Sequence, residues 1–183
     1  MKKLIVITAV VLSSASLWAD EVRGFQASLM PDIALQSKTT EISGLSLNIW
    51  GENPQHGVAL GFVNGSTGDS SGFTWGLFNY ADSYTGVAWG LANFSRNDFV
   101  GWQGGVFFCP CLVNVSQGTF TGFQEALVNC AQDFQGFQLA LVNYTENLHG
   151  VQVGFVNIAL NNPWFTEFPD KLATGFPIVN WSF

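Results

Sequence analysis

Hydrophobic residues alternate with small or polar residues along this chain in a phrase that occurs seven times. The copies resemble GFQLALVN and begin at Gly57, Gly72, Gly86, Gly101, Gly122, Gly136 and Gly150. Successive copies start 15, 14, 15, 21, 14 and 14 residues apart. Alternation with a period of two is typical of β-strands, and the many glycines argue against helix. A unit this short has room for one strand and one turn, so the pattern predicts an all-β repeat protein.

The two alternating sets of positions differ in size and polarity. One set carries a bulky apolar residue at an equivalent place in each copy: Phe62, Leu77, Leu91, Val106, Leu127, Leu141 and Phe155. The other carries Gly or Ala, namely Gly61, Gly76, Gly90, Gly105, Ala126, Ala140 and Gly154, with Thr74, Gln103, Gln124, Gln138 and Gln152 nearby. Most charged residues fall between the copies, so neither face of a strand resembles one made for bulk water.

Aromatic residues at both ends of the phrase favour a membrane setting. Tyr80, Phe94 and Tyr144 follow copies of the phrase, and Tyr84, Phe99, Phe120 and Phe134 precede copies. Such aromatic ends are typical of the interfacial girdles of outer-membrane barrels. Strands of about ten residues with short turns also suit a tilted membrane crossing. We therefore expect an antiparallel transmembrane β-barrel of about ten strands, which includes looser strands near residues 24–29 and 43–50 and a final strand within residues 173–183.

A parallel β-solenoid built from 14-residue repeats is the alternative fold. It would place every repeat in the same environment and stack Asn64, Asn79 and Asn93 into a hydrogen-bonded ladder. Glu125 also argues against the barrel. In a barrel its side chain would point at lipid near the middle of a strand, where burial of a charge is costly. The missing charges on both strand faces and the terminal Phe183 favour the barrel.

The first residues predict export. Lys2 and Lys3 precede an apolar run and small residues, as in a signal peptide of residues 1–19, which leaves residues 20–183 as a single domain. Loss of the two lysines would change the net charge from −7 to −9. An acidic protein is a poor partner for nucleic acid, whose phosphates require Lys and Arg. We therefore expect a bacterial outer-membrane or cell-surface location.

The residues with reactive side chains do not form a recognisable catalytic motif. Cys109, Cys111 and Cys130 are too few for a disulfide scaffold, and with the distant His56 and His149 they are too few for a metal site. Adjacent solenoid coils would bring Cys109 and Cys130 together, whereas the barrel predicts no disulfide between them. Glu125 and His149 could be drawn as an acid–base pair, but nothing orients them. We expect no cofactor, no metal and no enzyme.

Two resemblances add to this interpretation. The C-terminal residues Val179-Asn180-Trp181-Ser182-Phe183 resemble the β-signal that the insertion machinery of outer-membrane barrels reads. The tandem phrases GFQLALVN and GVQVGFVN resemble a group of bacterial surface proteins with GLQ-GL-N-type repeats. These resemblances imply a cell-surface setting, with outer-membrane lipid and the insertion machinery as partners, and supply no catalytic residues.

Three functions are therefore open. The first expectation is a small outer-membrane barrel with a structural or surface role, or a narrow pore, without catalysis. The second is a secreted or surface-attached β-solenoid that acts in adhesion. The third is a small outer-membrane enzyme that modifies lipid.

Overall fold

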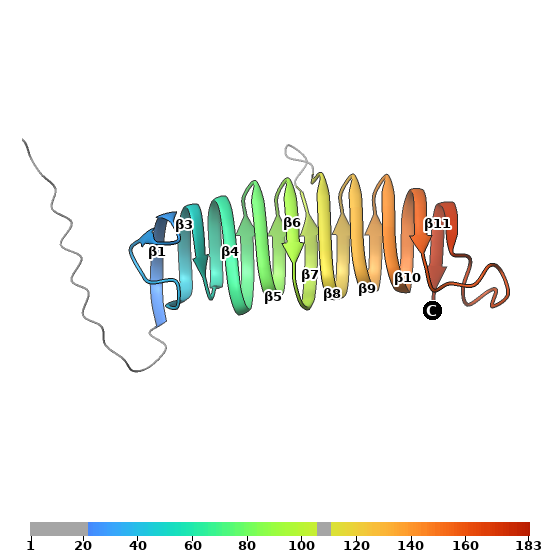
Figure 1. The fold of residues 1–183 in the computed structure, drawn as a ribbon, viewed down its shortest axis with the longest axis horizontal. Helices are drawn as coiled ribbons and strands as arrows, with labels where there is room; N and C mark the ends of the chain where they lie inside the picture. The colour runs from blue at the N-terminus through green and yellow to red at the C-terminus, as the bar shows by residue number, and fades with distance from the viewer. Residues whose placement is uncertain (1–21, 106–110) are drawn as a thin grey trace, which may run out of the picture.

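The computed structural model describes residues 22–105 and 111–183. The regular elements of this part are all strands, in the order β1 (Val22–Met30), β2 (Ile33–Ala34), β3 (Glu41–Asn53), β4 (His56–Trp75), β5 (Phe78–Trp89), β6 (Ala92–Ser95), β7 (Phe99–Gly104), β8 (Val113–Glu125), β9 (Val128–Leu139), β10 (Val142–Ala159) and β11 (Gly175–Ser182). The chain winds in coils along one axis, from β1 at one end to β11 at the other (Figure 1).

Neighbouring coils pair in parallel. In the pair formed by β9 and β10, Asn129 lies beside Asn143 and Gly136 beside Gly150. The protein is a parallel β-solenoid of about seven turns, whose sheet runs in one open series from β2 to β11. The expected antiparallel barrel of about ten strands is therefore wrong, and the alternative solenoid is the observed fold. Both folds place alternate side chains on opposite faces, so alternation alone could not separate them.

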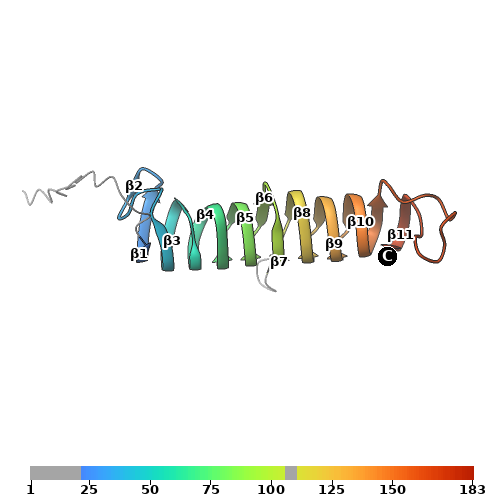
Figure 2. The same ribbon diagram turned by 90° about the horizontal axis from the view of Figure 1, so that it is seen from below.

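Each coil has two extended segments joined at two corners. We number its positions from the glycine that opens the phrase, which makes the asparagine position 8. In the coil that opens at Gly86, segment A is β6, at positions 7–10, and segment B is β7, which ends at position 4 of the next phrase. This coil has one inserted residue at its second corner, so Phe99, the first residue of β7, is aligned with position 13 of the 14-residue coils. Positions 5 and 6 form one corner, and positions 11 and 12 form the other. Comparison of Figure 1 with Figure 2, turned by 90°, shows that the coils are flattened.

Positions 3, 8, 10 and 13 face the interior. In the coil that opens at Gly136, Gln138, Asn143 and Thr145 are 0% exposed and Leu148 is 7% exposed. The bulky apolar residue at position 6 lies outside, where Phe155 is 78% exposed. The interior is thus rich in amides, which is costly unless each amide finds hydrogen-bond partners.

The asparagines at position 8 meet this requirement by forming a ladder. Each donates its Nδ2–H to the Oδ1 of the asparagine in the next coil at 2.9–3.0 Å, in the series Asn64, Asn79, Asn93, Asn114, Asn129, Asn143 and Asn157. Asn48 begins the ladder from position 5, because Gly51 occupies position 8 of its coil and leaves room for the amide. Stacking identical amides requires a parallel register, so the ladder and the direction of pairing support each other.

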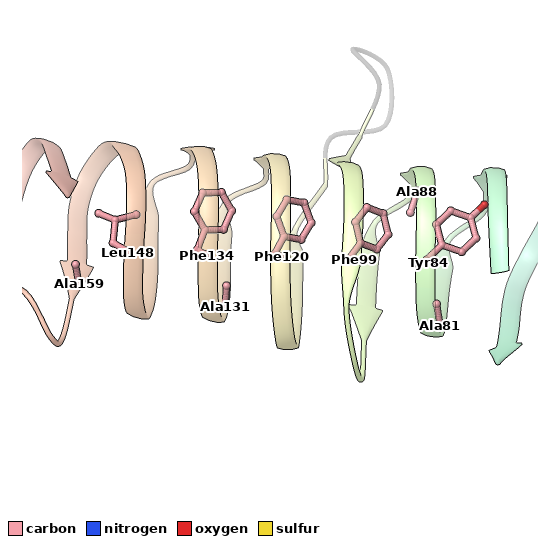
Figure 3. Close-up of a cluster of buried hydrophobic side chains, with 9 residues drawn as sticks. All are labelled: Ala81, Tyr84, Ala88, Phe99, Phe120, Ala131, Phe134, Leu148 and Ala159. Carbon is pink, nitrogen blue, oxygen red and sulfur yellow. The ribbon is translucent and has the colours of Figure 1, made fainter. Parts of the chain in front are cut away.

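Two further columns fill the interior. Gln152, Gln138, Gln124 and Gln103 join their amides at 2.8–3.0 Å. At position 13, Tyr84, Phe99, Phe120 and Phe134 stack with ring centroids 5.1–5.5 Å apart and interplanar angles of 3–22°, and Leu148 continues the row (Figure 3). Planar rings and planar amides can both stack at the spacing of neighbouring strands, about 4.8 Å.

Glycine at position 1 is required by close packing between coils. Gly136 has φ 136°, a value that other residues rarely adopt, and a Cβ there would lie 2.0 Å from the carbonyl oxygen of Gly122. The column extends to Gly44, whose Cβ would lie 2.1 Å from the oxygen of Gly24. The expected strands near residues 24–29 and 43–50 are therefore confirmed within β1 and β3, and both belong to irregular copies of the same coil.

The C-terminal strand closes the solenoid. β11 pairs antiparallel with β10, and an irregular segment at residues 160–174 precedes it. The Asn180 amide donates to the carbonyl of Ala173 at 2.8 Å, and the Phe183 N–H donates to the carbonyl of Asp170 at 3.1 Å. β11 and the segment before it thus cover the last coil. The proposed barrel-insertion signal at Phe183 is overturned with the barrel.

Candidate functional site

The most distinctive surface of the solenoid is an apolar belt along the corner at positions 5 and 6. We define it by the outward side chains at positions 4, 6 and 7. Position 4 contributes Leu47, Leu60, Trp75, Trp89, Leu139 and Val153; position 6 contributes Ile49, Phe62, Leu77, Leu91, Leu127, Leu141 and Phe155; position 7 contributes Trp50, Val63, Phe78, Val113, Val128, Val142 and Val156. Position 4 ends segment B and position 7 begins segment A, so the belt wraps around a convex corner onto both faces.

The belt is open to solvent along most of the molecule. Phe62 is 59% exposed, Phe78 is 53% exposed and Phe155 is 78% exposed. With coils about 4.8 Å apart, a row of about seven turns extends roughly 30 Å. Monomeric soluble proteins rarely leave a continuous apolar surface of this extent uncovered, and such surfaces mark contact with a protein or a membrane.

The opposite corner, at positions 11 and 12, carries most of the charges of the repeat region: Asp69, Asp82, Arg96, Asp98, Asp133 and Glu146. Arg96 Nη1 lies 3.2 Å from Asp82 Oδ1. This ion pair is exposed and contributes little to stability. Side chains in successive coils also bond along this corner, as Asn147 does by donating to Asp133. The solenoid is therefore amphipathic across its width.

Glu125 is the one charged side chain at position 4 in the repeat region. Its carboxylate accepts a hydrogen bond from the Gly105 backbone N–H and covers Gly104, where an added Cβ would lie 2.5 Å from Glu125 Cγ. Burial raises the pKa of the Glu125 carboxyl, and the hydrogen bond from Gly105 opposes this only in part. No hydrogen bond or ion pair joins Glu125 to His149 in the described part of the chain, so the acid–base pair drawn from the sequence does not form.

The cysteines lie at different depths. Cys111 is buried, and its thiol lies 3.2 Å from Asn114 Oδ1 beside the asparagine ladder. Cys130 is partly exposed with a free thiol whose pKa is raised by burial. Cys109 lies outside the described residues, so the predicted absence of a Cys109–Cys130 disulfide stays a prediction.

Sequence reasoning missed a row formed by Glu41, His56 and Ser71. His56 Nδ1 lies 2.9 Å from Ser71 Oγ, and His56 Nε2 lies 4.0 Å from Glu41 Oε1. The signal was available, because the three residues are 15 apart. The order Ser71, His56, Glu41 resembles that of a nucleophile, a base and an acid. However, the 4.0 Å between His56 Nε2 and Glu41 Oε1 is too long for a hydrogen bond. The neighbouring Gly57 and Gly72 also have no side chains that could form the walls of a substrate site. We therefore assign it no catalytic role.

Two further findings concern the part of the chain that the structure describes. No group of three or more His, Cys, Asp or Glu residues there is arranged to hold a metal ion. Likewise, that part contains no helix of sufficient length and apolarity to span a membrane.

Comparison with protein-family models, curated proteins and solved structures finds no match to this chain. The expected resemblances to proteins with GLQ-GL-N-type repeats and to outer-membrane barrels are therefore not supported, and the parallel pairing of the coils contradicts the second. The functional argument rests on the geometry of the solenoid itself.

Proposed function

We propose that this protein is a surface-attached β-solenoid that acts in adhesion and holds to a lipid surface through its apolar belt. The amphipathic cross-section supports the proposal: the apolar corner wraps onto two faces, while most charges of the repeats lie at the far corner. An amphipathic body of this kind lies in the membrane interface with its apolar side buried by about 5–10 Å. The charged corner then remains in water and faces outward.

The convex shape of the belt favours lipid over a rigid partner. A second protein surface could cover one face of the corner at a time and would leave Leu139 on segment B or Val142 on segment A in water. Fluid acyl chains can surround both sides of an edge. The belt also lacks Lys and Arg, so attachment would depend on apolar burial and little on anionic lipid headgroups.

The predicted signal peptide of residues 1–19 supports an exported protein at the bacterial cell surface. These residues lie outside the described part of the chain. The interior ladders support a structural role, because they make a stiff rod that can present its polar corner at a constant distance from the lipid. This proposal involves no catalytic step.

Vesicle flotation tests the proposal with a matched pair of variants. Leu141 is 49% exposed in the belt, and Leu160 is 45% exposed at position 11 of the opposite corner. We expect the protein to float with phosphatidylcholine vesicles at both low and high salt. Leu141→Ser, combined with Phe155→Ser, should reduce the bound fraction several-fold, whereas Leu160→Ser should leave it unchanged.

Two results would contradict lipid attachment. One is equal binding by the belt and control variants. The other is a stable dimer in the absence of lipid that the belt variants dissociate, because the belt would then be covered by a second copy of the chain.

A further inference from the structure

A small internal cavity lies in the coil that contains Tyr84 and Ala88. Its volume is about 10 Å³, counted as the space open to the centre of a water molecule. One buried water needs about this much space. The walls extend into the two neighbouring coils, with Ser66 and Thr74 in the coil before and Gln103 in the coil after. A cavity of this size can hold a single water molecule where polar groups line it.

The cavity lies where the column of interior glutamines is interrupted. In the later coils, each glutamine Nε2 donates to the Oε1 of the glutamine in the coil before it, as Gln124 does to Gln103 at 3.0 Å. The residue paired with Gln103 in the coil before it is Ala88, whose side chain cannot accept a hydrogen bond. Within the described residues, the side chain of Gln103 is therefore hydrogen-bonded only through its Oε1. Its Nε2 remains a buried donor beside Ala88.

The hydroxyl of Tyr84 is a second polar group at this cavity. Tyr84 begins the row of stacked interior rings, with Ala88 in the same coil (Figure 3). The side chain is 2% exposed, and its hydroxyl makes no hydrogen bond with the described residues. Burial raises the pKa of this hydroxyl, so it keeps its proton and can both donate and accept. Buried polar groups are nearly always paired in native proteins, so this hydroxyl and the Gln103 Nε2 together indicate a bound ligand.

The remaining walls limit the ligand to a small neutral molecule. Thr74 Oγ1 donates to Asn79 Oδ1 at 3.0 Å, and its oxygen can still accept a hydrogen bond. Among the described residues that line the cavity, none is charged, so an ion would be buried without a counter-charge. The polar side chains come from positions 3, 10 and 13, which point to the interior. The cavity and the groups that line it therefore lie on the same side of the strands.

We infer that the solenoid binds one internal water molecule here, in the place that a glutamine side chain fills in the later coils. The water accepts a hydrogen bond from Gln103 Nε2, shares one with the Tyr84 hydroxyl and donates one to Thr74 Oγ1. Three partners are typical of a buried water. The water thus continues the hydrogen-bonded column across the coil that lacks a glutamine. This inference does not depend on attachment of the belt to lipid.

Tyr84→Phe tests the inference, because a paired and an unpaired hydroxyl predict opposite changes in stability. If the hydroxyl is bonded to water, its removal should raise the equilibrium constant for unfolding about fivefold, as expected for one net hydrogen bond. If the hydroxyl has no partner, its removal relieves a buried polar group and should stabilise the protein. Urea denaturation followed by circular dichroism measures the change. Tyr144→Phe is the matched control, because Tyr144 is partly exposed on the outer face, and its effect should be about twofold or less.

A crystal structure of the parent protein, at a resolution that shows ordered water, tests the site without any variant. We expect one water within about 3.2 Å of both Gln103 Nε2 and Tyr84 Oη. In folded Ala88→Gln, the new amide should take the place of this water and accept from Gln103 Nε2. A dry cavity in the parent protein, a water that persists beside the new amide, or a more stable Tyr84→Phe variant would overturn the inference.

Discussion

Asn129 donates its amide hydrogen to Asn143 Oδ1 across 3.0 Å, and both side chains are 0% exposed. The same amide also lies 3.2 Å from the carbonyl oxygens of Gln124 and Leu139. One side chain therefore joins its own coil to the next one. The relation repeats along the solenoid and gives the polar interior its stability, because every buried amide in the middle of the ladder has partners on both sides.

Removal of one ladder asparagine should be strongly destabilising. Asn129→Ala leaves Asn143 Oδ1 buried without a donor, and we expect a loss of about 2–4 kcal/mol in the free energy of unfolding. Urea denaturation followed by circular dichroism measures the change. Asn147→Ala is the matched control, because Asn147 is exposed and its hydrogen bond to Asp133 lies at the surface; its effect should be about 0.5 kcal/mol or less. Similar losses in the two variants would contradict the importance of the interior ladder.

The glycine column makes a second prediction. In Gly136→Ala, the new Cβ would lie 2.0 Å from the Gly122 carbonyl oxygen at a φ of 136°. We expect the coils to separate locally and the protein to lose most of its cooperative unfolding transition. Gly68→Ala serves as the control, because Gly68 has φ 62° and no atom within 4 Å of the added Cβ. It should cost about 1–2 kcal/mol from backbone strain alone. A well-folded Gly136→Ala protein would show that the coils can shift to admit a methyl group.

The burial of Glu125 predicts that the stability of the protein depends on pH. Burial raises the pKa of its carboxyl above the ordinary value of 4.5, so the folded protein binds this proton more tightly than the unfolded chain does. The resulting contribution to stability is fully present below the unfolded-state pKa and is lost as the pH rises through the raised folded-state pKa. Glu125→Gln should therefore be at least as stable as the parent at pH 7, and its advantage should shrink towards pH 4.

Urea midpoints at several pH values measure this effect. Glu146→Gln provides the control, since Glu146 is exposed at the polar corner. A Glu125→Gln variant that is less stable at pH 7 would mean that the hydrogen bond from Gly105 outweighs the cost of burying the charge.

The class of structure and the strand positions follow from local sequence. Gln138 and Ala140 alternate with Leu139 and Leu141, which requires extended chain with two unlike faces, and repetition of the phrase implies repeated units. The sequence also predicts the stacking of Asn64, Asn79 and Asn93, provided that the repeats form a parallel solenoid. These features depend on neighbouring residues in one segment, so the sequence determines them by itself.

Whether neighbouring strands pair in parallel or antiparallel could be determined only from the tertiary structure. An antiparallel barrel and a parallel solenoid both separate Leu139 from Gln138. The absence of charges beside Leu141 fits lipid around a barrel strand as well as the outer corner of a solenoid coil. In the folded chain, Asn129 and Gln124 gain partners only when identical positions stack in register, which turns the amides inward and the leucines outward. The pairing of β1 with β3 likewise has no local signal, because the coil between them is irregular. The sequence thus determined the extended repeating unit, whereas the tertiary structure decided how the units pair, since hydrogen bonds between coils depend on residues that only folding brings together.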